Sequence, residues 1–229
     1  LRQARWRIIN AITQLTEEER IATYRQVRRG ARTSADFYVM AAISFSLAAL
    51  GLELNNTTVI IGAMVVGPLM SALLGIGMGV VQGDPWLLRT ALRTLVLGIV
   101  TGGVVSGIVG LIIPQSALTN EMLSRCSPTL LDLAVAAVAG AAAAYAAAHK
   151  AIASDLIGIA IAVAIEPSLA TFGLAIAMGY PRQAMGALLM FVTNLIAIIS
   201  AVVVMLLWMG FRPLLGERVH ARTFHRGIW

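Results

Sequence analysis

Residues 60–79 read IIGAMVVGPLMSALLGIGMG, and this stretch indicates which solvent the chain folds in. It contains no charged residue, and it matches the roughly 20 apolar residues that a helix needs to cross a bilayer. Gly67-Pro68 interrupts it near its middle, where proline removes an amide donor and frees the carbonyl of Met64. The stretch therefore predicts a membrane-spanning helix that is broken at mid-depth.

The rest of the chain has the same apolar character. Of its 229 residues, 59% are hydrophobic and only 12% are charged, which is more apolar surface than one soluble core buries. Six stretches approach or exceed the spanning length, at about 37–54, 57–81, 87–112, 130–148, 155–178 and 183–209. The predicted fold class is all-α, a polytopic membrane protein with six transmembrane helices.

The basic residues predict the orientation of these spans. Of the 17 Lys and Arg residues, all except Arg125 and Arg182 fall on one side of the map. Because Lys and Arg are retained on the cytoplasmic face, both termini are expected inside, in a multi-pass protein of the bacterial inner (cytoplasmic) membrane. Topology thus accounts for the net charge of +6 better than nucleic acid does, since no aromatic-interleaved basic patch or zinc spacing accompanies it.

Residues 1–36 precede the first span and predict two cytoplasmic amphipathic helices. The first runs from Leu1 to about Leu15, and Thr16 with Glu19 reads as a capping box that opens the second. A basic amphipathic elbow of this kind is typical of segments that bind anionic lipid headgroups. Packing against a neighbouring subunit or against an upstream domain explains the pattern equally well.

The chain resembles itself at an offset of 96 residues, with matches that include Gly83 with Gly179 and Pro85 with Pro181. Two three-helix repeats follow, at 37–112 and 130–209, joined by an extracytoplasmic loop at 113–129 and followed by a basic cytoplasmic tail at 210–229. Because three is odd, the two repeats are inverted in the membrane, an arrangement found in many secondary transporters and also in channels.

The fifth span repeats the proline of the second. Residues 157–179 read IGIAIAVAIEPSLATFGLAIAMG, and Glu166-Pro167 predicts a second break, facing the first. Glu166 is the sharpest candidate, since a carboxyl group at mid-membrane can carry a proton or bind a cation. The predicted substrate or ion site comprises Glu166, Pro167, Ser168, Gly67, Pro68, Ser71 and Asn194. The structural alternative is two proline kinks, glycines for close helix packing, and a Glu that bonds the backbone.

The sequence offers no sign of enzymatic chemistry. It contains no nucleophile constellation, no metal-ligand spacing and no phosphate loop, so we expect no catalytic residues, no metal and no cofactor. Its single cysteine, Cys126, excludes an internal disulfide.

Residues 55–84, NNTTVIIGAMVVGPLMSALLGIGMGVVQGD, resemble a bacterial membrane-protein family catalogued as domain of unknown function 389. The GPLM motif, the spaced glycines and the Gly83-Asp84 turn carry the resemblance, which extends over most of residues 37–209. It implies a membrane protein with a soluble cytoplasmic domain ahead of it. It also implies an apolar residue and prolines at the position of Glu166-Pro167-Ser168, where this chain departs from the pattern.

Together these patterns predict a transporter of a small ion or solute, with a site between two broken helices, that assembles as a homo-oligomer in the lipid bilayer. Two alternatives stay open. One is a homo-oligomeric ion channel whose pore lies on the symmetry axis. The other is a membrane anchor or signal-transmitting scaffold for a cytoplasmic domain.

Overall fold

Capping side chains set the points at which the helices begin in the computed structural model of the chain. Thr16 and Glu19 form the predicted capping box ahead of α2 (Glu17–Gly30). Asn56 accepts hydrogen bonds from the amides of Thr58 and Val59 at the start of α4 (Thr57–Val66). Comparable caps precede four further helices: Ser34 before α3 (Ala35–Glu53), Asp84 before α6 (Pro85–Ile112), Thr119 before α7 (Asn120–Ser124) and Thr129 before α8 (Leu130–Ala148).

The structure describes residues 15–113, 117–149 and 154–213, and between 154 and 164 it describes the backbone alone. Within these ranges no strand is present, and the remaining helices are α5 (Leu69–Gln82), α9 (Ser154–Ala177) and α10 (Pro181–Trp208). The predicted loop at 113–129 contains the short α7. The predicted helix from Leu1 to about Leu15 and the tail from 214 onwards lie outside the described residues.

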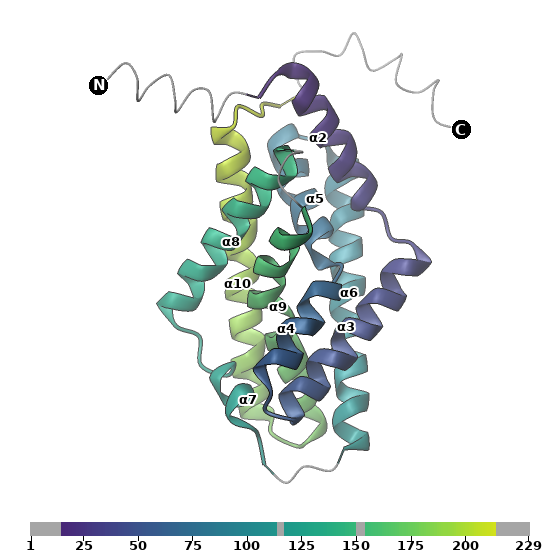
Figure 1. The fold of residues 1–229 in the computed structure, drawn as a ribbon, viewed down its shortest axis with the longest axis vertical. Coiled ribbons are helices and arrows are strands. Elements are labelled where there is room, and N and C mark those ends of the chain that lie inside the picture. Colours follow the sequence, from purple (N-terminus) through teal and green to yellow (C-terminus); the bar gives the residue numbers. More distant parts are fainter. Residues whose placement is uncertain (1–14, 114–116, 150–153, 214–229) are drawn as a thin grey trace.

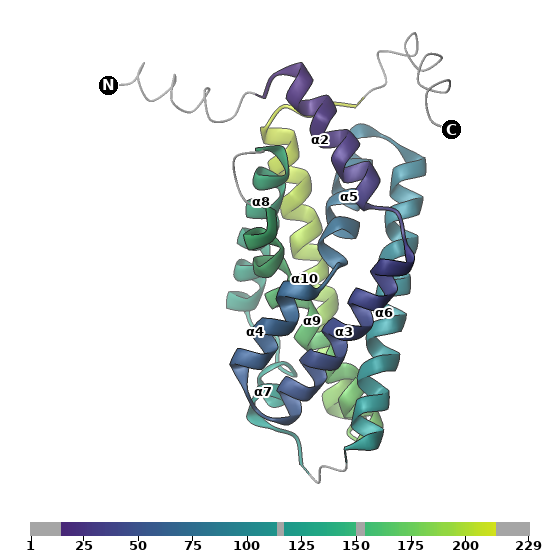
Figure 2. The same cartoon turned by 45° about the vertical axis from the view of Figure 1, so that its right-hand side comes forward.

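The helices run along the long axis of the molecule, with α9 at the centre (Figure 1). α6 and α10 flank α9, and α9 also packs against α3, α4 and α8. Figure 2 shows α2 lying across one end of the bundle, and α7 lies at the other end. α3 and α8 lie on opposite sides of the bundle.

The outer surface of this bundle is apolar. Four helices, α3, α6, α8 and α10, are long and apolar enough to cross a membrane, and α4 with α5 passes the same test as a pair bent by 56°. Many large apolar residues on the outside of the bundle are exposed; the exposed fraction is 73% for Leu111 and 85% for Leu130. Since soluble monomers rarely expose continuous apolar surfaces of this size, the chain is a multi-pass membrane protein.

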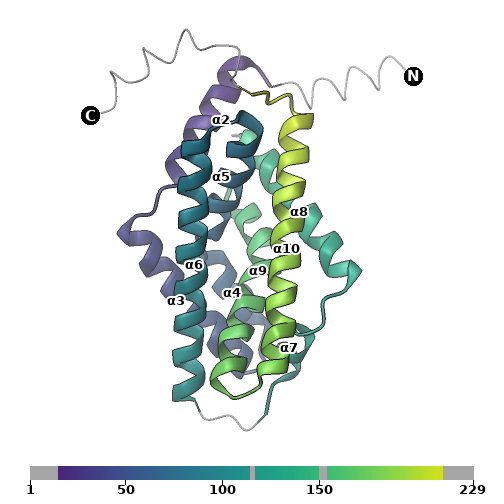
Figure 3. The same cartoon turned by 180° about the vertical axis from the view of Figure 1, so that it is seen from behind.

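Two turns 96 residues apart have the same construction. Gly83 and Gly179 each adopt the left-handed conformation, with φ of +64° and +79°, and each precedes a helix of 28 residues that starts on proline. α6 begins at the end of the bundle where α2 lies, whereas α10 begins at the other end, beside α7 (Figure 3).

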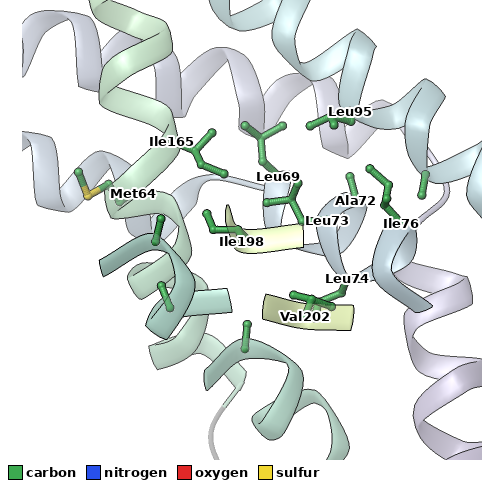
Figure 4. Close-up of a cluster of buried hydrophobic side chains, with 14 of the residues drawn as sticks. Met64, Leu69, Ala72, Leu73, Leu74, Ile76, Leu95, Ile165, Ile198 and Val202 are labelled. Atoms are coloured by element: carbon green, nitrogen blue, oxygen red, sulfur yellow. The ribbon is translucent and has the colours of Figure 1, made fainter. Parts of the chain in front are cut away.

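A cluster of buried side chains surrounds the junction of α4 and α5 with α9 and α10. Figure 4 shows Leu69, Leu73, Ile165 and Ile198 pointing toward one another from three helices. Lipid tails are as apolar as these side chains, so van der Waals packing contributes more to this cluster than the hydrophobic effect does.

Candidate functional site

The second span is broken at Gly67-Pro68, as the sequence predicts. Gly67 ends α4 with an extended backbone, at φ −68° and ψ 127°, because the ring of a following proline disfavours the helical conformation. α5 begins directly afterwards, without a side-chain cap. The last carbonyls of α4 and the first amides of α5 therefore lack helical partners at the middle of the span. In hydrocarbon such groups need partners from elsewhere in the protein.

Glu166 lies against this break from the central helix α9. Its side chain is fully buried, with 0% of its surface exposed. A Cβ atom placed on Gly67 would lie 1.5 Å from Glu166 Oε1, so the carboxyl group occupies the space that any larger residue would fill. The absence of a side chain at Gly67 is what allows the carboxyl group to reach the backbone of the broken helix.

Ser44, in the middle of α3, joins the carboxyl group to α4. Its Oγ lies 2.6 Å from Glu166 Oε2 and 2.9 Å from the carbonyl oxygen of Ala63. Ala63 belongs to the last turn of α4, where a carbonyl has no amide four residues ahead within the helix. Ser44 is itself fully buried. The serine thus connects three helices at one point.

Glu166 Oε1 has no hydrogen-bond partner among the described residues. In particular, no amide from the first turn of α5 donates to it, although helix N-termini commonly bind carboxylates. A buried oxygen without a partner is costly if the group is ionised and much less costly if it is neutral. The arrangement suits a neutral acid, or a carboxylate that receives a small cation on its open side.

The expectation of a second break at Glu166-Pro167 is wrong. α9 is one helix from Ser154 to Ala177, with Pro167 inside it. Glu166 and Gly67 both precede a proline, but Glu166 keeps the helical backbone conformation whereas Gly67 adopts an extended one. Prolines inside spanning helices are tolerated when neighbouring groups replace the lost hydrogen bond. The bond that Pro167 cannot make is the one to the carbonyl of Val163, and one turn further along α9 the Thr171 hydroxyl donates to the carbonyl of Pro167 itself at 2.8 Å. The site therefore lies between one broken helix and one continuous helix.

The other predicted site residues do not all meet at Glu166. Ser168 is fully buried on α9, and its hydroxyl has no partner among the described residues. Asn194 is buried on α10, but the hydrogen bond of Glu166 goes to Ser44 instead. Ser71 donates to the carbonyl of Pro68 at 3.1 Å and lines a small cavity between α2, α5 and α8.

Ser44 was not among the site residues predicted from the sequence. A single serine in an apolar span is ordinary, because small polar residues mostly hold helices together. Its partner Glu166 lies 122 residues away, so only the tertiary structure pairs them. The signal available in the sequence was the position of Ser44 at the middle of the first span, level with Gly67 and Glu166 in theirs.

A second polar cluster holds α2 on the turn between α5 and α6. The Tyr24 hydroxyl donates to Asp84, and burial followed by this hydrogen bond raises the pKa of Tyr24 to about 12. The guanidinium groups of Arg28 and Arg32 lie 4.5 Å and 5.2 Å from the centre of the Trp86 ring. These contacts fix the basic helix to the start of α6.

Comparison with known proteins places the chain among uncharacterized relatives. An uncharacterized protein from Methanocaldococcus jannaschii, an archaeon, is 28% identical to it over 175 residues, which are 76% of this chain and 54% of that protein. The chain thus spans about half the length of this relative. No solved structure matches.

A family model covers the break, Glu166 and Asn194 in one match. It extends over residues 64–200, which is more than half of the chain, and it includes the GPLM motif on which the resemblance rested. The chain belongs to the family described as domain of unknown function DUF389.

Proposed function

We propose that this chain is a transporter of a small ion or solute, with its site at the α4–α5 break facing Glu166. The observation that carries the proposal is the fully buried Glu166 carboxyl group, in contact with Gly67 and with one oxygen unpaired among the described residues. An ionisable group in this position is costly, and in membrane proteins such groups mark ion and substrate pathways.

The break supplies the other half of the site. Carbonyl oxygens at the end of α4 and amides at the start of α5 present opposite partial charges to the same point. Broken helices in secondary transporters use these groups to bind ions and charged substrates at the midplane. Gly67 and Pro68 create the break, and Ser44 with Glu166 provides side-chain oxygens beside it.

We also infer six spans in two inverted repeats, with α9 as the fifth span. The matched turns at Gly83 and Gly179, at opposite ends of the bundle, support this inference. The basic residues favour a cytoplasmic location for α2 and for both termini, in the inner membrane. α6 presents Gly103 and Gly107 along an open groove beside α9, which favours close contact with a second copy in a homo-oligomer.

Anionic lipids are the proposed partners of α2. Arg28 and Arg32 both lie over the ring of Trp86, a residue that is 41% exposed, and neither lies within ion-pair distance of a described carboxylate. Tryptophan favours the headgroup region, and arginine binds phosphate there. We propose no enzymatic activity, cofactor or nucleic-acid partner.

A signal-transmitting scaffold is the second candidate. The Tyr24–Asp84 hydrogen bond ties α2 to the start of α6, and the Thr94–Ala31 hydrogen bond of 2.8 Å ties the end of α2 to the third turn of α6, so a displacement of α2 passes into the spans. This function predicts that loss of the Tyr24–Asp84 bond abolishes activity whereas loss of the Glu166 carboxyl group does not.

The test is flux in proteoliposomes under a panel of proton, cation and anion gradients, with Glu166→Gln as the variant. Glu18→Gln is the matched control, because Glu18 is exposed on α2. We expect a gradient that drives flux in the wild type and the control but at least about tenfold less in Glu166→Gln, the loss expected from about 1.4 kcal/mol or more. Equal flux in all three would contradict a pathway past Glu166, and discrete single-channel currents would indicate the channel instead.

A further inference from the structure

The hydroxyl group of Ser44 has one hydrogen and two oxygen neighbours within hydrogen-bond distance. Glu166 Oε2 lies at 2.6 Å and the Ala63 carbonyl oxygen at 2.9 Å. A carbonyl oxygen only accepts hydrogen bonds, and an ionised carboxylate also only accepts them. The two contacts together require two hydrogens, and serine supplies one.

If Glu166 were ionised, one of the two contacts would join oxygens with no hydrogen between them. Such a contact is repulsive, and Oε1 would carry charge in a fully buried position without a partner among the described residues. If Glu166 carries a proton on Oε2, the acid donates to Ser44 Oγ and Ser44 donates to Ala63. Each close contact then has its own hydrogen.

The charged surroundings do not favour the ionised form. Glu166 has no ion pair in the described part of the chain. The titratable residues on the helices that pack against α9 lie toward the ends of those helices, and none of them contacts Glu166: Asp36, Tyr38 and Glu53 on α3, Arg89 and Arg93 on α6, Asp132 and Tyr145 on α8, and Arg182 on α10, with none on α4 or α5.

We propose that the ligand of this site is a proton held by Glu166, and that hydrogen bonds from the protonated acid to Ser44 and from Ser44 to the Ala63 carbonyl connect it to the end of α4. This inference rests on the proposed function and names the ion that the site binds. On release, the O–H bond of Glu166 breaks and the proton passes to water that enters the opened site. The Ser44 hydrogen then turns to the carboxylate, and the Ala63 carbonyl loses its partner.

This exchange links proton occupancy to the position of α4. Ala63 lies four residues before Gly67, so its carbonyl belongs to the end of α4 that borders the break. While the proton is bound, Ser44 joins α3 to α4. When it leaves, that bond is lost, and α4 is free to move about the extended backbone at Gly67. Protonation of Glu166 thus holds α4 against α3, and deprotonation releases α4 from α3.

The test is infrared difference spectroscopy of the full chain in proteoliposomes, recorded between acid and alkaline buffer without sodium or potassium. We expect a carbonyl stretch from a protonated carboxylic acid in the wild type. Glu166→Gln should lose this band, and its amide can replace the donor to Ser44, so the fold should persist. Ser44→Ala should keep the band but shift it to higher frequency, because the acid loses its acceptor.

Ser106→Ala is the matched control, since Ser106 is fully buried on α6 and its hydroxyl has no partner among the described residues. It should leave the band in place. A wild-type spectrum without a band that Glu166→Gln removes would overturn the proposal, as would a band unmoved by Ser44→Ala. A carboxylate band that shifts when sodium is added would also overturn it in favour of a metal cation.

Flux measured in the same vesicles separates this inference from the proposed function. A Glu166 band with no flux under any gradient would support proton binding and contradict transport. Flux without the band would support transport and contradict the proton as the ligand of Glu166.

Discussion

At the residue scale, the proposed site depends on a contact between a glycine and a carboxyl group. Gly67 leaves the space into which Glu166 Oε1 fits, and Ser44 holds the other oxygen. Each of the three residues is ordinary alone. Together they place an ionisable group, a hydroxyl and an uncapped helix end at one depth in the membrane.

A methyl group at position 67 should break this contact. In Gly67→Ala, the new Cβ would lie 1.5 Å from Glu166 Oε1, and the backbone at φ −68° suits alanine, so the effect is steric. Overpacking of this kind costs about 1–3 kcal/mol. We expect a lower thermal unfolding temperature in detergent.

Gly62→Ala is the control for that measurement. Gly62 lies in the same helix, and a Cβ there would meet nothing within 4 Å. Alanine in a helix should be neutral, or stabilise by about 0.5–1 kcal/mol. Equal destabilisation by the two substitutions would show that the space at Gly67 has no special role.

At the element scale, local signals in the sequence placed the helices well. Thr16 and Glu19 cap α2 as predicted, since a cap depends only on residues within one turn. The break at Gly67-Pro68 was also predicted. The one at Glu166-Pro167 was not observed, because a proline alone does not decide between a break and a continuous helix; the neighbours in space do.

The docking of α2 gives a prediction in alkaline solution. The Tyr24 pKa is raised from 10.0 to about 12, by burial and then by the bond to Asp84. Below pH 10 the hydroxyl is protonated whether α2 is docked or released, so its contribution to docking is complete. As the pH rises through about 12, Tyr24 ionises and that contribution is lost.

A spin label on α2 reports this release. With the label at Glu18→Cys in a Cys126→Ser background, we expect its mobility to increase between pH 10 and about 12. Tyr24→Phe should be mobile already and show no alkaline step. Tyr38→Phe, on α3, should behave like the wild type; a step of equal size in Tyr24→Phe would assign the transition to another group.

At the scale of the whole molecule, α3, α4, α6, α8 and α10 pack around the central helix α9. The sequence offset of 96 residues anticipated the turns at Gly83 and Gly179 and the proline starts of α6 and α10. It did not anticipate that the second predicted span is broken, into α4 and α5, whereas the fifth, α9, is continuous. Glu166 of α9 packs against Gly67 at the break of α4, and a repeat pattern does not contain such a contact between distant residues.

The proposed topology predicts that the two ends of the bundle face different compartments. Single cysteines at Glu18 on α2 and Asn120 on α7, both exposed, should react with a membrane-impermeant thiol reagent from opposite sides. The background is Cys126→Ser, although burial raises the pKa of Cys126 and slows its own reaction. Reaction of both cysteines from one side would contradict the topology.

The most direct measurement for a pathway at the α4–α5 break is modification of Glu166 by a lipid-soluble carbodiimide in wild-type proteoliposomes, with flux followed in parallel. A protonated carboxyl group gives its proton to a carbodiimide nitrogen and adds through its oxygen to the central carbon, and mass spectrometry locates the adduct. We expect the adduct at Glu166, and a loss of flux in proportion to the fraction modified. Complete modification of Glu166 with undiminished flux would contradict the account.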